Sequence, residues 1–318
     1  MLFTHICLSK CCFELCAVAA GIRQKGNDEI LKDSKVINER PRAILYLVIT
    51  AILWSLGGLL IKSVNSNPVA IAGVRSGISA ILLIALMGKP KLNWSFAQVG
   101  AAIAYSATVL LFVIANKNTT AANAILIQYT APIYVVILSA WLLKEKVQLL
   151  DVVAILFALG GMALFFVDSI STKGMIGNIF AAISGVAFAL FTIFMRMQKE
   201  GSPIESVLLG NIITAVIGIP FLFGSMPDTK GWLCLTILGI VQLGLPYILY
   251  SKAIKHVTAV EASIIPILEP ILNPVWVFLL LGEKPGALAI TGGAIVIVAI
   301  TGRCLISLRK SDSKTISC

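Results

Sequence analysis

The stretch TAANAILIQYTAPIYVVILSAWLLKEK (residues 120–146) returns 138 residues later as TAVEASIIPILEPILNPVWVFLLLGEK (residues 258–284). Ten of the 27 aligned positions are identical, and they pair Pro132 with Pro270 and Glu145-Lys146 with Glu283-Lys284. Shared hydrophobicity alone would align many Leu and Ile residues, but it would not align proline with proline or Glu-Lys with Glu-Lys. The chain therefore contains an internal repeat, and internal symmetry is common among membrane transport folds.

The composition places this repeat in a membrane. The 318 residues are 58% hydrophobic and 13% charged, with a mean hydropathy of +0.96. A soluble domain is about 45–50% apolar and about 25% charged. An ordinary soluble enzyme, a disordered chain and a secreted disulfide scaffold are therefore excluded. A polytopic membrane protein fits, because lipid takes the place of a larger core.

Apolar segments long enough to cross a bilayer core of about 30 Å follow one another along most of the chain. Ten are expected, at residues 43–62, 69–88, 95–115, 121–143, 147–167, 175–196, 204–224, 231–252, 259–281 and 285–307. The connecting loops are short, so neighbouring helices must be antiparallel. The sequence predicts an all-α polytopic membrane protein with ten transmembrane helices.

The distribution of positive charge predicts the orientation. With the N-terminus inside, 19 Lys and Arg residues fall on the inner side and five on the outer side. Cytoplasmic loops carry an excess of Lys and Arg. We therefore expect a multi-pass protein of the plasma (inner) membrane with both termini in the cytoplasm, and we do not read the net charge of +10 as a nucleic-acid signal.

Each half holds five spans, and five is an odd number, so the second half enters the membrane from the opposite side. The expected units are a cytoplasmic extension at 1–42, a first repeat at 43–167, a second repeat at 175–307 and a cytoplasmic tail at 308–318. Two inverted repeats can exchange between mirror-related conformations, each open to one side, which is the physical basis of alternating access.

Cysteines gather in the extension, at Cys7, Cys11, Cys12 and Cys16. Acylation or metal binding is one interpretation of their spacing, and a flexible extension without such a role is the other. The chain has no Cys-x-x-Cys pair, and its two histidines are His5 and His256. No metal site, cofactor or catalytic set is therefore expected.

Glu269 is the sharpest functional candidate, because a charge at the bilayer centre costs about 2.5–3.5 kcal/mol on insertion scales. It lies about 15 Å into its span at 1.5 Å per residue. Its surroundings read Pro266-x-x-Glu269-Pro270-x-x-x-Pro274, so a kinked helix with freed carbonyl groups is predicted. The functional interpretation is substrate contact or proton coupling, and the alternative is a neutralised structural carboxyl.

Arg75 is the second candidate, at a similar depth in the second span. Its guanidinium fork suits a carboxylate or a phosphate. A structural ion pair, or a side chain reaching to the outer interface, is the alternative.

Polar and aromatic residues beside the symmetric prolines complete the expected site: Gln128, Tyr129 and Asn273, with Trp54 as a wall of the cavity. Most buried amides and phenols merely bond a neighbouring helix. Gln242 and Tyr247 are further candidates of the same kind. Glu261 and Asp151 lie near helix ends, where we expect solvated charges.

The sequence resembles the drug/metabolite transporter superfamily, and within it the ten-helix EamA-type members. The likeness rests on Trp54-Ser55, on Pro68 and Arg75, and on the two copies of the repeated stretch. It covers residues 43–307, and it departs at Lys144, where the family usually has Gly before the Glu. The resemblance implies a secondary carrier of small metabolites, often an exporter or exchanger.

The expected function is secondary active transport of a small metabolite, such as an amino acid or a similar polar or zwitterionic solute. No Gly-x-x-x-x-Gly-Lys-Ser/Thr phosphate loop is present, so an ion gradient or substrate exchange must drive it, with proton-coupled export or exchange as one mode. The alternatives are a membrane-embedded enzyme and a channel or receptor module. The expected partners are the solute and the lipid bilayer; a homodimer is left open.

Overall fold

The computed structural model describes residues 39–88, 90, 92–167, 174–272 and 286–316, and these residues form helices and short connections without a strand. Most of the expected N-terminal extension, with its four cysteines, lies outside them. The first half consists of the span Glu39–Ser63, whose last part is α2 (Gly57–Ser63), followed by α3 (Pro68–Met87), α4 (Phe96–Asn118), α5 (Ala121–Gln128), α6 (Ala131–Leu138), the π-helix η1 (Ser139–Leu143) and α7 (Leu149–Phe165).

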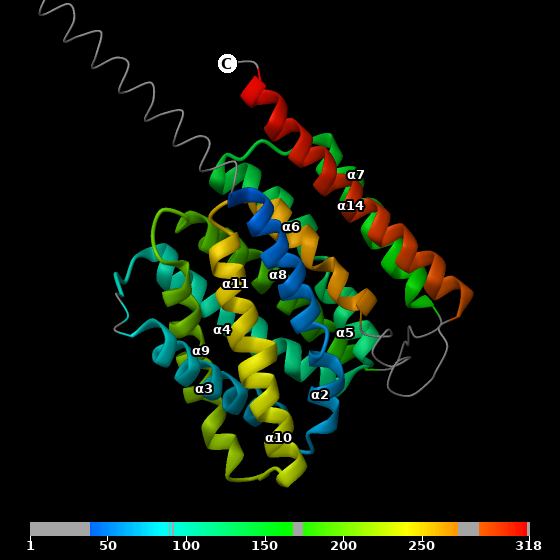
Figure 1. Cartoon of the computed structure of the whole chain (residues 1–318). Coiled ribbons are helices and arrows are strands. Elements are labelled where there is room, and N and C mark those ends of the chain that lie inside the picture. The colour runs from blue at the N-terminus through cyan, green and yellow to red at the C-terminus, as the bar shows by residue number, and fades with distance from the viewer. Residues whose placement is uncertain (1–38, 89, 91, 168–173, 273–285, 317–318) are drawn as a thin grey trace, which may run out of the picture.

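The second half is built in the same order. It contains α8 (Met175–Met197), α9 (Pro203–Gly218), the short η3 (Ile219–Leu222), α10 (Thr229–Ile237), the π-helix η4 (Leu238–Gly244), α11 (Leu245–Ala253), α12 (Ala259–Ile264), the 3₁₀ turn η5 (Ile265–Ile267) and α14 (Ala287–Ile316). Figure 1 shows that the first span begins, and α14 ends, at the same end of the molecule.

The helices match the expected spans to within a few residues. Among the described residues, eight helices are long and apolar enough to cross a membrane, and the apolar α7 is shorter at 17 residues. The expected span at 259–281 is described only as far as residue 272. Two ends differ from expectation: the first helix already begins at Glu39, and the last continues to Ile316 where a separate tail was expected.

Helix breaks occur at matching places in the two halves. Proline has no backbone N–H, so Pro132 cannot bond the carbonyl of Gln128, and Pro270 cannot bond that of Pro266. α5 accordingly ends at Gln128, and two turn residues precede α6. In the second half the helix tightens into η5 just before Glu269. The regular α-helix is therefore interrupted at mid-span, where a kink was predicted from the prolines of the second half.

Corresponding helices of the two halves pack against each other in opposite directions. The start of α3 meets the end of η3, where the Ser66 hydroxyl donates to the Ser225 carbonyl at 2.5 Å. α7 packs on α14, and a Cβ added to Gly161 would lie 2.8 Å from the carbonyl oxygen of Gly292. Gly161 is late in its helix and Gly292 is early in the other, so the pair runs antiparallel. The repeats are inverted, as the odd number of spans predicts.

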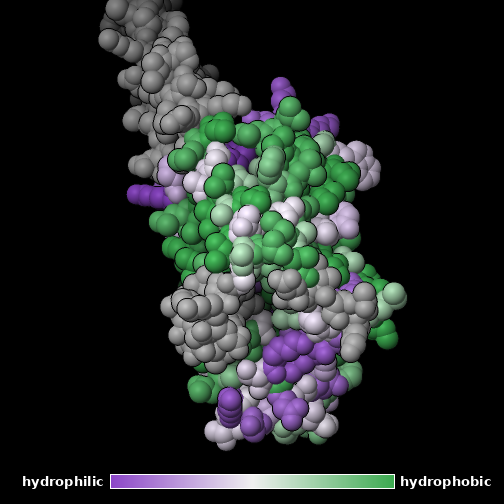
Figure 2. Space-filling view, turned by 90° about the vertical axis from the view of Figure 1, so that its right-hand side faces the viewer, coloured by the Kyte–Doolittle hydropathy of each residue, from purple (hydrophilic) through white to green (hydrophobic). Residues whose placement is uncertain are grey.

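The outer surface is apolar. Large hydrophobic side chains such as Phe96, Leu149 and Val298 are at least 70% exposed, which suits contact with lipid. Figure 2 shows hydrophobic residues over much of one face, with hydrophilic residues gathered mainly toward its two ends. α7 and α14 lie side by side at the edge of the bundle (Figure 1).

Candidate functional site

A small pocket with a cavity volume of about 50 Å³ lies between the two halves. The first half lines it with Trp54, Arg75, Thr108, Val109, Phe112, Gln128 and Tyr129, and the second half with Phe188, Gln242, Leu243, Tyr247 and Glu269. Five of the six residues expected from the sequence thus line one pocket. The sixth, Asn273, lies outside the described residues.

The Tyr129 hydroxyl joins the helix breaks of the two halves. It lies 2.9 Å from the carbonyl oxygen of Pro266 and 2.5 Å from Oε2 of Glu269. The Pro266 carbonyl is the one that Pro270 leaves without its helical donor. Tyr129 therefore satisfies a backbone acceptor that the proline has freed, and it also holds the Glu269 carboxyl group in place.

The single proton of the Tyr129 hydroxyl faces two oxygen atoms, one from Pro266 and one from Glu269. A phenol carries one proton, so it cannot donate to the Pro266 carbonyl and to Glu269 at once. When Glu269 is protonated, its own hydroxyl donates to the Tyr129 oxygen, and Tyr129 donates to Pro266. Both short contacts are then hydrogen bonds. The geometry thus accommodates a proton on Glu269.

Arg75 lies on α3 and is buried, with 1% of its surface exposed. One terminal nitrogen donates to Oε1 of Gln242 at 3.1 Å, and the other lies 3.5 Å from the carbonyl oxygen of Val109. Within the described residues, no carboxylate lies within 4.0 Å of the guanidinium, and Nε has no partner. The structural ion pair considered for Arg75 is thus absent from the described part of the chain.

Gln242 is held in place by local backbone geometry. It lies in the π-helix η4, a form that is rare and often found at functional sites. Gly57 faces it, and a Cβ at that position would lie 2.7 Å from Nε2 of Gln242. The glycine therefore leaves the space that the Gln242 amide fills.

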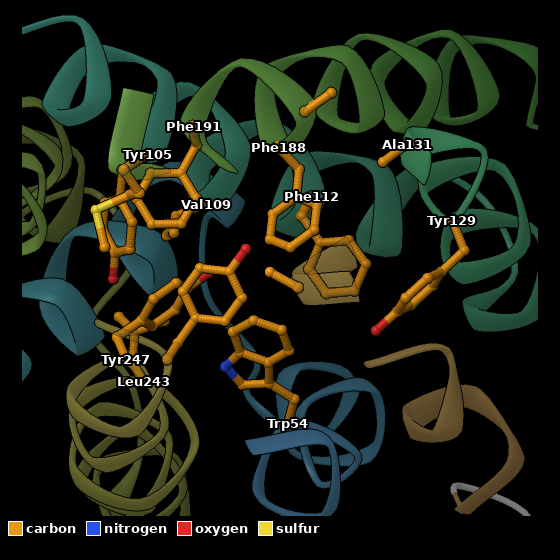
Figure 3. Packing of buried hydrophobic residues seen from close by; sticks show 14 of the residues in the cluster. Trp54, Tyr105, Val109, Phe112, Tyr129, Ala131, Phe188, Phe191, Leu243 and Tyr247 are labelled. Carbon is orange, nitrogen blue, oxygen red and sulfur yellow. The ribbon is translucent and has the colours of Figure 1, made fainter. Parts of the chain in front are cut away.

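Aromatic rings form the middle of the pocket. Trp54 packs on Tyr247 at a ring-centroid distance of 5.0 Å and on Phe188 at 6.0 Å. Figure 3 shows Trp54, Phe112 and Phe188 between Tyr247 on one side and Tyr129 on the other. The Trp54 indole nitrogen is buried and has no hydrogen-bond partner among the described residues.

Gln128 takes a supporting position at the edge of the pocket. Its amide nitrogen donates to the Ser184 hydroxyl at 2.7 Å, and that hydroxyl donates to the Thr108 carbonyl at 3.0 Å. The chain of hydrogen bonds ties α5 to α8 and α4. The amide nitrogen of Gln128 is engaged in this chain.

Five lining residues were not anticipated from the sequence: Thr108, Val109, Phe112, Phe188 and Leu243. The first four come from the two closely packed helices α4 and α8, and Leu243 follows Gln242 in η4. Nothing local distinguishes these side chains from other apolar or small residues on the same helices, so only the packing reveals them.

Glu261 and Asp151 do not lie in solvent, and that expectation is wrong. Each is 3% exposed. Glu261 pairs with Arg40 and Arg303, and Asp151 pairs with Arg303. Burial is possible because each carboxylate has a cation and also caps its own helix.

Comparisons with known proteins agree with this architecture. The model of the EamA-like transporter family matches the chain twice, at residues 41–167 and 175–303. A solved structure with a TM-score of 0.72 and 19% identity covers 84% of this chain and 98% of its own, which shows the fold alone.

Among curated proteins, similarity extends to archaea, bacteria and a mammal. An uncharacterized transporter of Archaeoglobus fulgidus is 26% identical over 80% of this chain and 93% of its own. The pseudopaline exporter CntI of Pseudomonas aeruginosa is 25% identical over 80% and 93%. Solute carrier family 35 member G1 of mouse is 25% identical over 81% and 77%.

Proposed function

The chain belongs to the EamA-like transporter family, and on that premise we propose that it carries a small polar metabolite across the membrane by alternating access. It is a multi-pass membrane transporter and not an enzyme. An amino acid or a similar zwitterion is the solute class that we propose, since the pocket offers both a guanidinium and a carboxyl group.

One observation carries the proposal: the pocket is lined by both inverted halves at the place where each half has a broken helix. Broken helices at mid-depth between inverted repeats commonly form the substrate sites of secondary transporters. Rocking one half against the other would then expose the same residues to each side in turn.

Glu269 supports coupling to protons. It lines the pocket, and its contact with Tyr129 can be made with or without a proton on the carboxyl group. Release of that proton would disturb the Tyr129–Pro266 hydrogen bond, which lies at the helix break. Proton movement and helix rearrangement would thereby be linked at one position.

The setting of the transporter follows from the charge distribution. The excess of Lys and Arg on one side supports cytoplasmic N- and C-termini in the plasma membrane. The Pseudomonas relative is named an exporter, which favours export or exchange as the direction here. The apolar outer face of α7 and α14 is compatible with either lipid or a second copy.

Release of a metabolite mixture tests the function even though the solute is not yet identified. The purified chain is placed in liposomes loaded with a polar metabolite extract, and mass spectrometry follows which solutes leave. We expect a small set of polar metabolites to leave faster than from protein-free liposomes, and an imposed pH gradient should change that rate. Identical loss from both kinds of liposome would contradict transport.

A further inference from the structure

We infer that Arg75 and Trp54 form a carboxylate-binding subsite within the pocket, so that the transported solute carries a carboxylate at this end. The inference rests on the proposed transport function and deepens it. It concerns which chemical group of the solute is recognised and which two side chains recognise it.

The first reason is the charge state of Arg75. Its side chain is almost fully buried, and the two partners in the described part of the chain are neutral oxygens of Gln242 and Val109. A buried charge without a counter-ion is costly, and proteins normally pair it. A guanidinium that lines a pocket and lacks a counter-ion there is suited to a ligand that brings one.

The second reason is the number of unused donors. A guanidinium has five N–H groups, and only two nitrogen atoms of Arg75 have partners, while Nε has none. The Trp54 indole nitrogen, which can only donate, is also buried without an acceptor. Both side chains line the same pocket. Two buried donors without acceptors indicate a missing acceptor group, and a carboxylate has two oxygens for them.

The third reason is the position of the other acid–base group. Tyr129 lies beyond the aromatic rings, on the far side of Trp54 from Tyr247 (Figure 3), and its hydroxyl contacts Glu269 at 2.5 Å. A solute with a carboxylate at Arg75 would place its apolar part against Trp54, Phe112 and Phe188. Its amine, where it has one, would then reach toward Glu269.

The metabolite-loaded liposomes described above test this subsite when Arg75→Gln, Trp54→Phe and the exposed control Arg42→Gln are compared with wild type. We expect every solute released by wild type to carry a carboxylate, because Arg75 must be neutralised. Arg75→Gln should slow that release roughly tenfold to hundredfold, which is the factor that corresponds to the usual free energy of a hydrogen bond to a charged group. Trp54→Phe should slow it less, and Arg42→Gln should leave it unchanged.

The outcomes separate the subsite from transport itself. If wild type releases solutes without a carboxylate, or if Arg75→Gln and Trp54→Phe both release the same solutes at wild-type rates, the subsite is refuted while transport stands. If wild type releases nothing, the transport function fails and the subsite with it. Trp54→Phe keeps the test decisive should Arg75→Gln not fold.

A second observation, independent of the pocket, concerns the end of the molecule that we assign to the cytoplasm. Three ion pairs cross between the two halves there, and we propose that they form a gate closing this end. Arg40 pairs with Glu261 at 2.6 Å, and Arg303 pairs with Asp151. Arg303 also lies 3.4 Å from Glu261, which joins the two pairs into one cluster.

The third pair ties the neighbouring loops together. Nε of Arg196 lies 2.8 Å from Oε1 of Glu145, and Oε2 of Glu145 accepts the backbone N–H of Ala259 at 3.0 Å. Arg196 also donates to the carbonyl of Ile254 at 2.9 Å. Glu145 thus holds the start of α12 and the end of α8 to the first half, and Arg196 holds the end of α11 to α8.

At the opposite end, the described links between the two halves are made by neutral groups. Asn123, the repeat mate of Glu261, donates to Asn178 at 3.2 Å, and Thr119 donates to the same oxygen at 2.8 Å. Ser66 and Ser225 form another link between the halves. Among the described residues, no ion pair crosses between the halves at this end. Among the described residues, the links between the halves are therefore charged at one end and neutral at the other.

Hydrogen exchange read by mass spectrometry tests this gate in lipid nanodiscs. Asp151→Asn removes a charge but keeps the shape, and Arg40→Gln removes a cation that is partly exposed. Both should make backbone amides at 255–262 exchange several-fold faster and those at 117–124 exchange more slowly, because opening one end closes the other. Arg42→Gln, whose partner Glu39 lies on the same helix, should change neither region.

The reciprocal change is the decisive readout. Local damage would speed exchange at 255–262 and leave 117–124 as it was, and that result would overturn the gate. An equal effect of Arg42→Gln, or no effect of either test variant, would also overturn it. Because this measurement needs no substrate, its failure is distinguishable from failure of metabolite release.

Discussion

The hydroxyl of Tyr129 in the first half lies 2.5 Å from Oε2 of Glu269 in the second half. The same hydroxyl lies 2.9 Å from the carbonyl oxygen of Pro266, which Pro270 deprives of its helical partner. The two inverted halves therefore meet at the residue that is proposed to carry protons. Both residues line the pocket. On our proposal, a change in the protonation of Glu269 would therefore affect both the bound solute and the helix break.

Glu269→Gln should lower transport and flatten its dependence on pH between about 5 and 8, because an amide keeps the shape of the carboxyl but neither gains nor loses a proton. The measurement is metabolite release from liposomes at several pH values, with expression and detergent stability as controls. An unchanged pH profile would remove the coupling role from Glu269.

Tyr129→Phe should destabilise the protein by about 1–3 kcal/mol, because the Pro266 carbonyl and the Glu269 carboxyl lose their shared partner in a buried site. Thermal unfolding in detergent measures this loss. The matched control is Tyr134→Phe, on the same span, since Tyr134 is only partly buried and does not line the pocket. Equal stability of the two variants would contradict the role of Tyr129.

Arg75→Lys tests the shape of the cation separately from its charge. Lysine keeps one positive charge but loses the planar fork that binds two oxygens. We expect release of carboxylate-bearing solutes to fall by roughly tenfold, while protein stability changes little. Full activity of Arg75→Lys would mean that charge balance alone matters at this position.

Gly161→Ala and Gly160→Ala form a matched pair on α7. A Cβ at Gly161 would lie 2.8 Å from the carbonyl oxygen of Gly292, whereas a Cβ at Gly160 meets nothing within 4 Å. Gly161→Ala should therefore push α7 away from α14 and cost about 1–3 kcal/mol in unfolding free energy. Gly160→Ala should be neutral, and equal losses would show that close helix approach is not the cause.

Lys144→Gly should stabilise the turn after η1. Lys144 has a φ of 53°, in the left-handed region that costs a residue with a side chain about 1–2 kcal/mol and costs glycine nothing. The aligned position in the second copy of the repeat is Gly282. A higher unfolding temperature is expected for Lys144→Gly, but not for Lys146→Gly in the same loop, where φ is negative.

Local patterns in the sequence were sufficient for the membrane class, the approximate spans and the inversion of the repeats. Span lengths follow from runs of apolar residues, and inversion follows from an odd number of spans in each repeat. The prolines at 266 and 270 likewise predicted a break at mid-span in the second half, since a missing N–H acts within one turn of its own helix. These properties depend on residues that are neighbours in the chain.

The contacts between the halves depended on tertiary structure. The sequence does not reveal that Gln242 contacts Arg75, from which it is separated by 167 positions. It also does not reveal that Arg75 has no carboxylate partner among the described residues. Glu261 looked like a solvated helix end, yet the fold buries it between Arg40 and Arg303, which are 263 positions apart. Such pairings are set by how each helix is rotated and tilted against its neighbours, and hydropathy, which is nearly uniform around these spans, does not specify that rotation.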